Sequence, residues 1–291
     1  MLIELGNDVL KIKICTLGAE MISLQACSGL EYMWQGDPGF WESTSPLLFP
    51  TVGCLKDGFY IYNGERYELP VHGFARSEEF VVGAHTNNEV TLSLVANDRT
   101  RINYPFEFSF DITFKLNGAR LEMDVVVGNN GDCDLPFSFG LHPGFAHSWV
   151  ENDRMENYRI TFSSAETSDN IRVEGGLLST DADSFLEDES VIDLTDDHFA
   201  VDAIVLKAIK SEQVTLSHQL SEKKLTMDIR DFPDFALWSQ PGAGFICLEP
   251  WQGHADRTNH NHDIWQKEGI LTLTPNKTKE FHSSLSISGI N

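Results

Sequence analysis

The chain has 291 residues, of which 41% are hydrophobic and 22% are charged. These proportions exclude a wholly disordered or fibrous chain, and the length allows one large domain, which we expect to span residues 1–291. The 44 acidic residues outnumber the 21 basic ones and give a formal net charge of −23. Because such a surface repels nucleic acid and anionic membranes, we expect neither as a partner.

The first ten residues lack the basic start and apolar stretch of a secretory signal. No segment is long and apolar enough to cross a bilayer. The cysteines are odd in number, widely spaced and without a Cys-x-x-Cys pair; they are Cys15, Cys27, Cys54, Cys133 and Cys247. This usage predicts reduced thiols in a cytoplasmic protein. The sequence leaves open whether the chain is a monomer or a homodimer.

Alternation of apolar and polar residues is the dominant pattern, and it predicts short β-strands in chain order. The first lie at residues 10–14, 60–62 and 66–69, the last two joined by Asn63-Gly64. Strands at 90–95 and 106–116 follow, and Asn117-Gly118 joins the latter to 121–127 in a long hairpin. Further strands are expected at 203–206, 214–216, 225–229 and 271–273.

Many short strands with turn signals between them, and almost no amphipathic helix, indicate an all-β fold. We expect a large antiparallel β-sandwich with few short helices. Acidic residues crowd together between Asp181 and Asp202, and this stretch is predicted to be a solvated loop. Asp202 is the exception, because it precedes the apolar run 203–206 and can project from a strand end into a site.

Three residues with proton-transfer chemistry stand in Gly- and Pro-rich settings. They are His72 in His-Gly-Phe-Ala-Arg, His142 in Gly-Leu-His-Pro-Gly-Phe, and Glu249 in Cys-Leu-Glu-Pro-Trp. Each alone is explained by a turn or a strand end. However, a carboxylate closing an apolar run is costly to bury without partners, and burial raises its pKa toward that of a base useful near neutral pH. Together the three residues predict an acid/base site.

Five motifs in order carry a family resemblance. They are residues 45–53 (Ser-Pro-Leu-Leu-Phe-Pro-Thr-Val-Gly), 55–58 (Leu-Lys-Asp-Gly), 72–76, 142–143 and 248–251. With them the chain resembles the aldose 1-epimerase (galactose mutarotase) family. It is most similar to the bacterial branch associated with lactose and galactose operons, which neighbours the hexose-6-phosphate 1-epimerases. The resemblance implies a large antiparallel β-sandwich, in agreement with the strand pattern.

The resemblance also implies roles for individual residues. Glu249 matches the family's general base, His142 its general acid, and His72 a second histidine that orients the sugar near its ring oxygen. Arg76 and Asp202 match residues that bind sugar hydroxyls. The chain departs from the family at Cys54, where an arginine is expected after Val52-Gly53; Lys56, two residues further on, is a candidate for part of that role.

The implied reaction explains these residue types. Opening a cyclic hemiacetal removes a proton from the hydroxyl on C1 and adds one to the ring oxygen, so a base and an acid must face one ring. We therefore expect a small sugar as the partner and neither a metal nor another cofactor. Trp251 and Phe74, together with Trp41 and Phe145, are candidates for the apolar face that such a ring needs.

Three alternatives remain open at this point. A hexose 6-phosphate could be the substrate, although only Arg76 and Lys56 near the motifs could hold a phosphate, which favours a free aldose. A non-catalytic carbohydrate-binding sandwich would keep the aromatic residues but would not need Glu249 and His142 together. A third possibility is a metal site formed by His254, Asp256, His260, His262 and Asp263.

Overall fold

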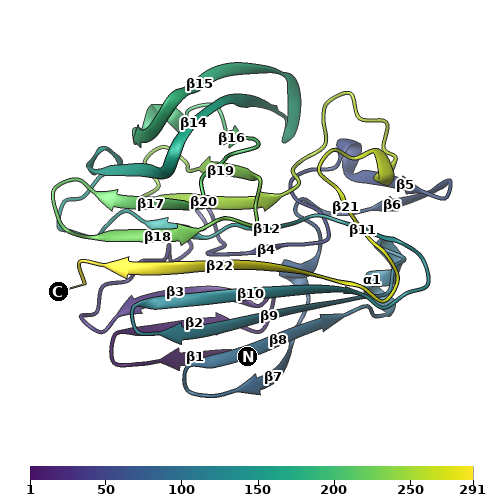
Figure 1. Ribbon diagram of the computed structural model, residues 1–291, viewed down its shortest axis with the longest axis horizontal. Coiled ribbons are helices and arrows are strands. Elements are labelled where there is room, and N and C mark those ends of the chain that lie inside the picture. The colour runs from purple at the N-terminus through teal and green to yellow at the C-terminus, as the bar shows by residue number, and fades with distance from the viewer. Residues whose placement is uncertain (291) are drawn as a thin grey trace.

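Antiparallel β-sheets organise this chain, and one short α-helix lies at their edge (Figure 1). The structure is a computed structural model that describes residues 1–290. Within that range, the larger main sheet has nine strands in the order β15-β14-β17-β18-β22-β10-β9-β8-β7. They are β7 (Val81–His85), β8 (Glu89–Val95), β9 (Phe108–Asn117), β10 (Arg120–Asn129), β14 (Tyr158–Glu174), β15 (Leu177–Asp193), β17 (Gln213–His218), β18 (Lys224–Asp228) and β22 (Thr278–Ser288).

A second main sheet has six strands in residues 1–290, in the order β16-β19-β20-β12-β4 with β13 also paired to β20. They are β4 (Leu47–Leu48), β12 (Phe139–Leu141), β13 (Gly144–Ala146), β16 (Ile204–Leu206), β19 (Asp234–Trp238) and β20 (Phe245–Gln252). The remaining strands form small sheets: β1 (Leu2–Gly6), β2 (Leu10–Cys15) and β3 (Glu20–Ala26); β5 (Phe59–Tyr62) and β6 (Glu65–Glu68); β11 (Leu135–Phe137) and β21 (Leu271–Leu273).

Helical segments are short. They are α1 (Asp98–Asn103) and the single-turn 3₁₀ segments η1 (Lys56–Gly58), η2 (Ala75–Ser77), η3 (Met155–Asn157), η4 (Asp196–Phe199) and η5 (Ile264–Gln266). No helix among residues 1–290 has the length and apolar character that a bilayer crossing requires. The expectation of an all-β antiparallel sandwich with few short helices is confirmed.

Aromatic side chains fill the space between the two main sheets. Strand β9 buries alternate residues, as its sequence pattern predicts. The ring of Phe110 on β9 lies 5.6 Å from that of Phe139 on β12, and 4.9 Å from that of Phe49. Farther along, Phe162 on β14 packs edge-on against Phe235 on β19. These contacts between sheets make the molecule a sandwich.

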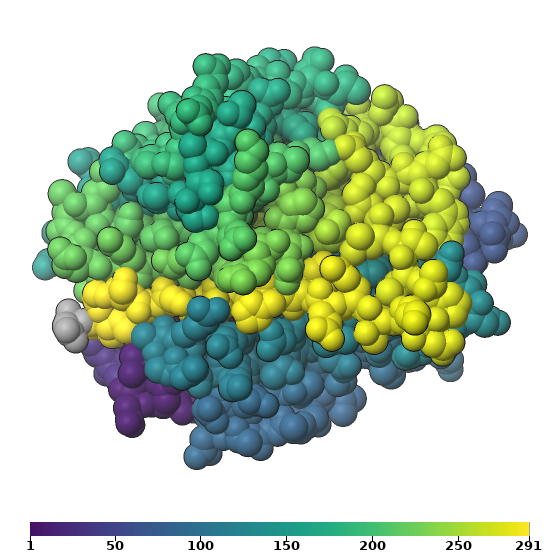
Figure 2. Space-filling model, in the orientation of Figure 1, coloured from purple at the N-terminus to yellow at the C-terminus, as the bar shows by residue number. Residues whose placement is uncertain are grey.

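Chain ends and middle contribute to the same core. One cluster of buried residues runs from Ile3 to Ile287. In Figure 2, β22 crosses the face as a yellow band between N-terminal segments in purple and blue and the green strands of the middle of the chain. The assignment of residues 1–291 to one domain stays a prediction, which this continuous core supports.

Both predicted hairpins are confirmed. Strands β9 and β10 pair across Asn117-Gly118, and β5 and β6 pair across Asn63-Gly64. The solvated loop predicted for residues 181–202 is wrong in part. Most of it belongs to β15, a 17-residue edge strand paired with β14. Its acidic side chains are nevertheless exposed, and charges along an unpaired edge oppose pairing with a second chain.

Gly73 shows how tightly the turn after His72 is fixed. Its φ is +73°, and a Cβ there would lie 2.3 Å from the backbone oxygen of Phe49. Gly64 has a similar φ of +82° but open space around it. We predict that Gly64→Ala lowers the free energy of unfolding by about 1–2 kcal/mol, the cost of a left-handed conformation alone, and that Gly73→Ala lowers it by clearly more. Urea unfolding of the two variants measures this difference, and equal losses would contradict the steric argument.

Candidate active site

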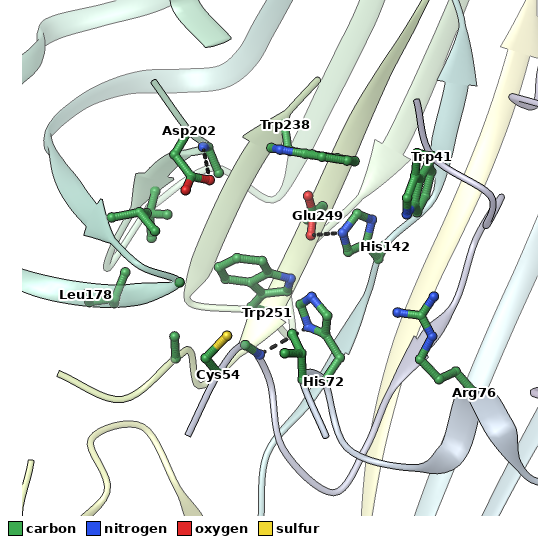
Figure 3. Close-up of a pocket in the computed structure, with 17 residues that line it drawn as sticks. Trp41, Cys54, His72, Arg76, His142, Leu178, Asp202, Trp238, Glu249 and Trp251 are labelled. Atoms are coloured by element: carbon green, nitrogen blue, oxygen red, sulfur yellow. Dashed lines mark hydrogen bonds and ion pairs between the residues drawn. The ribbon is translucent and has the colours of Figure 1, made fainter. Parts of the chain in front are cut away.

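A cavity of about 230 Å³ lies where the six-stranded sheet meets the tip of the β14–β15 hairpin (Figure 3). Its lining comes from segments far apart in the sequence: Trp41, Gly53, Cys54, Val71, His72, Arg76, His142, Val173, Gly176, Leu178, Asp202, Ala203, Val205, Trp238, Glu249, Trp251 and Ala255. Both predicted histidines and the predicted glutamate are among them. The sandwich therefore brings the three proton-transfer candidates together.

Glu249 and His142 meet at the centre of the cavity. Glu249 lies in the middle of β20, and His142 lies between β12 and β13, both of which pair with β20. Glu249 Oε2 is 3.1 Å from His142 Nε2. Glu249 Oε2 and His142 Nδ1 nevertheless have no hydrogen-bond partner among the described residues. Two buried polar atoms are thus left for a ligand, because such atoms are rarely left without partners.

Burial determines which protonation states this pair favours. Glu249 is 1% exposed and His142 is 7% exposed. Burial raises the pKa of Glu249 well above its ordinary range, and burial, followed by the nearby His72, lowers the pKa of His142. Both shifts have one cause, since a low-dielectric site disfavours the charged form of either group. The neutral acid and the neutral imidazole are therefore the protonation states that burial favours.

His72 faces His142 edge-on, with ring centroids 5.4 Å apart. Its Nδ1 accepts a hydrogen bond from the Gly53 backbone N–H at 3.1 Å. Burial and the Arg76 guanidinium lower the pKa of His72 to about 4. The ring is therefore neutral near pH 7, and because Nδ1 is an acceptor, its one proton sits on Nε2. His72 is thus a hydrogen-bond donor for a ligand in the cavity.

Tryptophans enclose the pair, and glycines make room for them. The indole of Trp41 stacks on His142 at 5.0 Å between ring centroids, and Trp238 packs edge-on against the same imidazole at 5.8 Å. A Cβ on Gly144 would lie 2.6 Å from Trp41, and a Cβ on Gly140 would lie 2.6 Å from Trp251. Both glycines beside His142 are therefore explained by the space that an indole occupies.

Arg76, Asp202 and Trp251 line the cavity, as the sequence predicts for residues that contact a ligand. Trp251 follows Glu249 by two residues on β20 and so projects from the same face. Its buried Nε1 has no partner among the described residues. One carboxylate oxygen of Asp202 accepts the backbone N–H of Ala203 at 2.7 Å, which orients the side chain.

Two predicted contact residues lie elsewhere. Phe74 packs in the core against Phe49, Tyr104 and Phe108, so it offers no face to the cavity. Lys56 donates from Nζ to the backbone oxygen of His260 at 3.0 Å and does not line the cavity. Neither side chain is therefore a contact residue of this cavity. The phenyl ring of Phe74 is part of the core, and the Lys56 ammonium is hydrogen-bonded to a backbone oxygen.

Sequence reasoning missed the wall built by the β14–β15 hairpin. Val173, Gly176 and Leu178 from its tip line the cavity, as does Trp238 at the end of β19. A Cβ on Gly176 would lie 2.6 Å from the Cys54 sulfur, so two small residues allow the hairpin to close on this side. A larger side chain at position 54, such as the expected arginine, would require the hairpin tip to move. No local signal reveals such a contact between segments this far apart in the sequence.

The metal alternative for residues 254–263 is not supported by the geometry. Asp256 forms an ion pair with the buried Lys267 at 2.8 Å, and His262 stacks on Phe59 at 4.2 Å between ring centroids. His254 Nδ1 contacts the backbone oxygen of Ala255 at 2.9 Å. Within residues 1–290, the one group of three or more metal-ligating side chains with closely spaced ligand atoms is His142, Cys247 and Glu249.

The lowered pKa of His72 predicts a pH effect on stability. Between pH 6.5, the ordinary histidine pKa, and pH 4, the unfolded chain binds a proton that folded His72 does not. Stability is therefore lost as the pH falls through this window. We expect His72→Gln to reduce the proton uptake on unfolding near pH 5 by about one proton, measured from unfolding free energies at several pH values. His85→Gln, a change of an exposed histidine, is the control, and an equal reduction in both variants would contradict the assignment.

Comparisons with known proteins identify the family of this chain. The family model described as aldose 1-epimerase matches residues 1–272. The plasmid-encoded protein LacX of Lactococcus lactis subsp. lactis is 34% identical over 299 residues, which cover 99% of each chain. The galactose mutarotase related enzyme from Lactobacillus acidophilus has a TM-score of 0.95 at 32% identity, covering 100% of this chain and 98% of that one. A galactose mutarotase-like protein from Lactobacillus casei ATCC 334 has a TM-score of 0.93 at 26% identity, covering 99% and 100%. The chain belongs to the aldose 1-epimerase family.

Proposed function

We propose that this protein interconverts the α and β anomers of a free aldose such as galactose or glucose. The contact of 3.1 Å between Glu249 Oε2 and His142 Nε2 inside the cavity carries the proposal. An acid and a base this close can reach the C1 hydroxyl and the ring oxygen of one sugar, because both of these oxygens are bonded to C1. Membership of the family supports an isomerase acting on carbohydrates, and the choice of substrate and of residue roles is our proposal.

Proton transfer by the pair follows from its burial. Glu249 takes the proton of the C1 hydroxyl while His142 gives one to the ring oxygen, and the hemiacetal opens. The transfers convert the carboxylate and imidazolium, the ionised form of the pair that burial disfavours, into a neutral acid and a neutral imidazole, the states that burial favours. After rotation about the C1–C2 bond, the reverse transfers close the ring as the other anomer and restore the pair.

Other cavity residues would hold the ring during this rotation. His72 donates from Nε2, Arg76 supplies a permanent positive charge, and Asp202 accepts hydrogen bonds from hydroxyl groups. Trp251 offers an indole face to the C–H side of the sugar and an unpaired N–H. This division between an apolar platform and a few polar groups is typical of sites for small ligands.

Removal of either member of the pair should abolish most of the rate. We expect Glu249→Gln and His142→Asn each to slow anomerisation by about 10²–10⁴-fold, the usual contribution of a positioned acid or base. Polarimetry on freshly dissolved α-galactose and α-glucose measures the rate. Glu280→Gln, which makes the same change at an exposed position on β22, should keep the wild-type rate.

A non-catalytic carbohydrate-binding protein is the competing interpretation. It would bind the sugar without accelerating the optical change, and neither substitution at the pair would matter for the rate. An unaccelerated reaction with wild-type protein would therefore sink the enzyme proposal for the sugars tested. The unpaired atoms of Glu249 and His142 favour catalysis, because a binding platform alone does not require them.

Phosphorylated sugars are the alternative class of substrate. Among the described residues that line the cavity, Arg76 alone is a lysine or arginine, whereas phosphate sites usually combine several such groups. We expect kcat/KM for glucose to exceed that for glucose 6-phosphate by at least about tenfold, which corresponds to a loss of about 1.4 kcal/mol in transition-state binding. Anomerisation rates on the two sugars, with an anomer-specific coupled assay or NMR, decide this, and a preference for the phosphate would reverse the assignment.

A further inference from the structure

Cys247 is a fully buried thiol that the proposed reaction does not use. It precedes Glu249 by two residues on β20, so both side chains project from one face of the strand. The turn that carries His142 lies beside this face, since Gly144 pairs with Cys247. One ligand atom from each of His142, Cys247 and Glu249 lies within 4.8 Å of the other two.

These side chains suit a borderline-soft divalent cation. Imidazole nitrogen, thiolate sulfur and carboxylate oxygen are the three ligand types that Zn²⁺ takes in proteins, at about 2.0–2.3 Å. Tetrahedral ligands at such lengths lie roughly 3–4 Å apart. The observed spread of up to 4.8 Å is therefore wider than that of a bound tetrahedral set by about 1 Å, which side-chain rotation has to close.

The charges of the three ligands match a divalent cation. A cation with two positive charges is balanced by one thiolate and one carboxylate, so the occupied site would be neutral in a region that disfavours net charge. Burial lowers the pKa of His142 and so favours the uncharged imidazole that binds metals. Burial raises the pKa of Cys247 and Glu249, so binding of the cation releases one proton from each of these two ligands. Glu249 Oε2 and His142 Nδ1 have no hydrogen-bond partner within residues 1–290, so binding breaks no hydrogen bond of these two atoms.

We propose that His142, Cys247 and Glu249 form a binding site for Zn²⁺ or a similar thiophilic divalent cation, and that the bound cation blocks the acid/base pair. Three protein ligands leave a fourth position, where water can bind. The indoles of Trp41 and Trp238 cover the imidazole and form the apolar shell that commonly surrounds such sites. Sugar and cation then compete for the same two side chains.

Cobalt provides a direct test of the ligand set. In protein without an affinity tag, with the exposed Cys27 and Cys133 replaced by Ser, we expect one equivalent of Co²⁺ or Zn²⁺ to bind. The Co²⁺ complex should show a thiolate-to-metal charge-transfer band. Cys247→Ser should lose that band and weaken binding at least tenfold, whereas Cys54→Ser, a change of the other thiol beside the cavity, should keep both.

The outcomes separate this proposal from the proposed function. Metal binding is measured without sugar, so the cation site stands or falls even if no anomerisation is found. Absence of stoichiometric binding, or a band that survives Cys247→Ser, overturns it. Zn²⁺ should also inhibit anomerisation by the Cys54→Ser protein at concentrations at least tenfold lower than by the Cys247→Ser protein. Equal inhibition of the two would overturn the claim that the bound cation blocks the pair, and thermal unfolding of each variant checks that it is folded.

Discussion

Glu249 and His142 are ionisable side chains that contact each other in a buried position, and the sheets and the cavity walls fix that contact. Both side chains are costly to bury in the charged form, and burial therefore favours the neutral acid and the neutral imidazole. Strand β20 holds the carboxylate in the middle of the six-stranded sheet, and the short connection between β12 and β13, both of which pair with β20, holds the imidazole. Pairing of these strands therefore fixes the distance between the two side chains.

Packing of tryptophans against glycines turns this contact into a site. Gly140 and Gly144 flank His142, and the indoles of Trp251 and Trp41 occupy the space that a Cβ would need. The same indoles wall the cavity. These rings exclude water from the cavity. The lower dielectric constant strengthens electrostatic interactions inside it and contributes to the pKa shifts of Glu249 and His142. The buried thiol of Cys247 lies against the pair and gives the same residues a second, metal-binding chemistry.

The β14–β15 hairpin gives this cavity its individual character. Its edge strand carries exposed acidic side chains, while its tip presents Val173 and Leu178 to the cavity and sets Gly176 against the Cys54 sulfur. Cys54 stands where the family resemblance predicts arginine, and the small sulfur is what allows the hairpin to approach. From the sequence alone, Cys54 indicates only a lost ligand contact, but its small side chain is also required for the packing of the hairpin. The cavity therefore has an apolar wall at the place where the resemblance predicts a positively charged side chain.

Local pattern in the sequence determined much of the fold. Alternation along residues 106–116 and 121–127 and the Asn-Gly turns predicted strands and hairpins correctly, because strand period and turn geometry are properties of neighbouring residues. Tertiary structure decided that residues 181–193 form an edge strand, that Phe74 belongs to the core, and that Lys56 bonds a backbone oxygen. It also decided that Trp238, Cys247 and the hairpin tip surround the pair. Those positions depend on which distant segments pack together, and packing contacts leave no period in a single sequence.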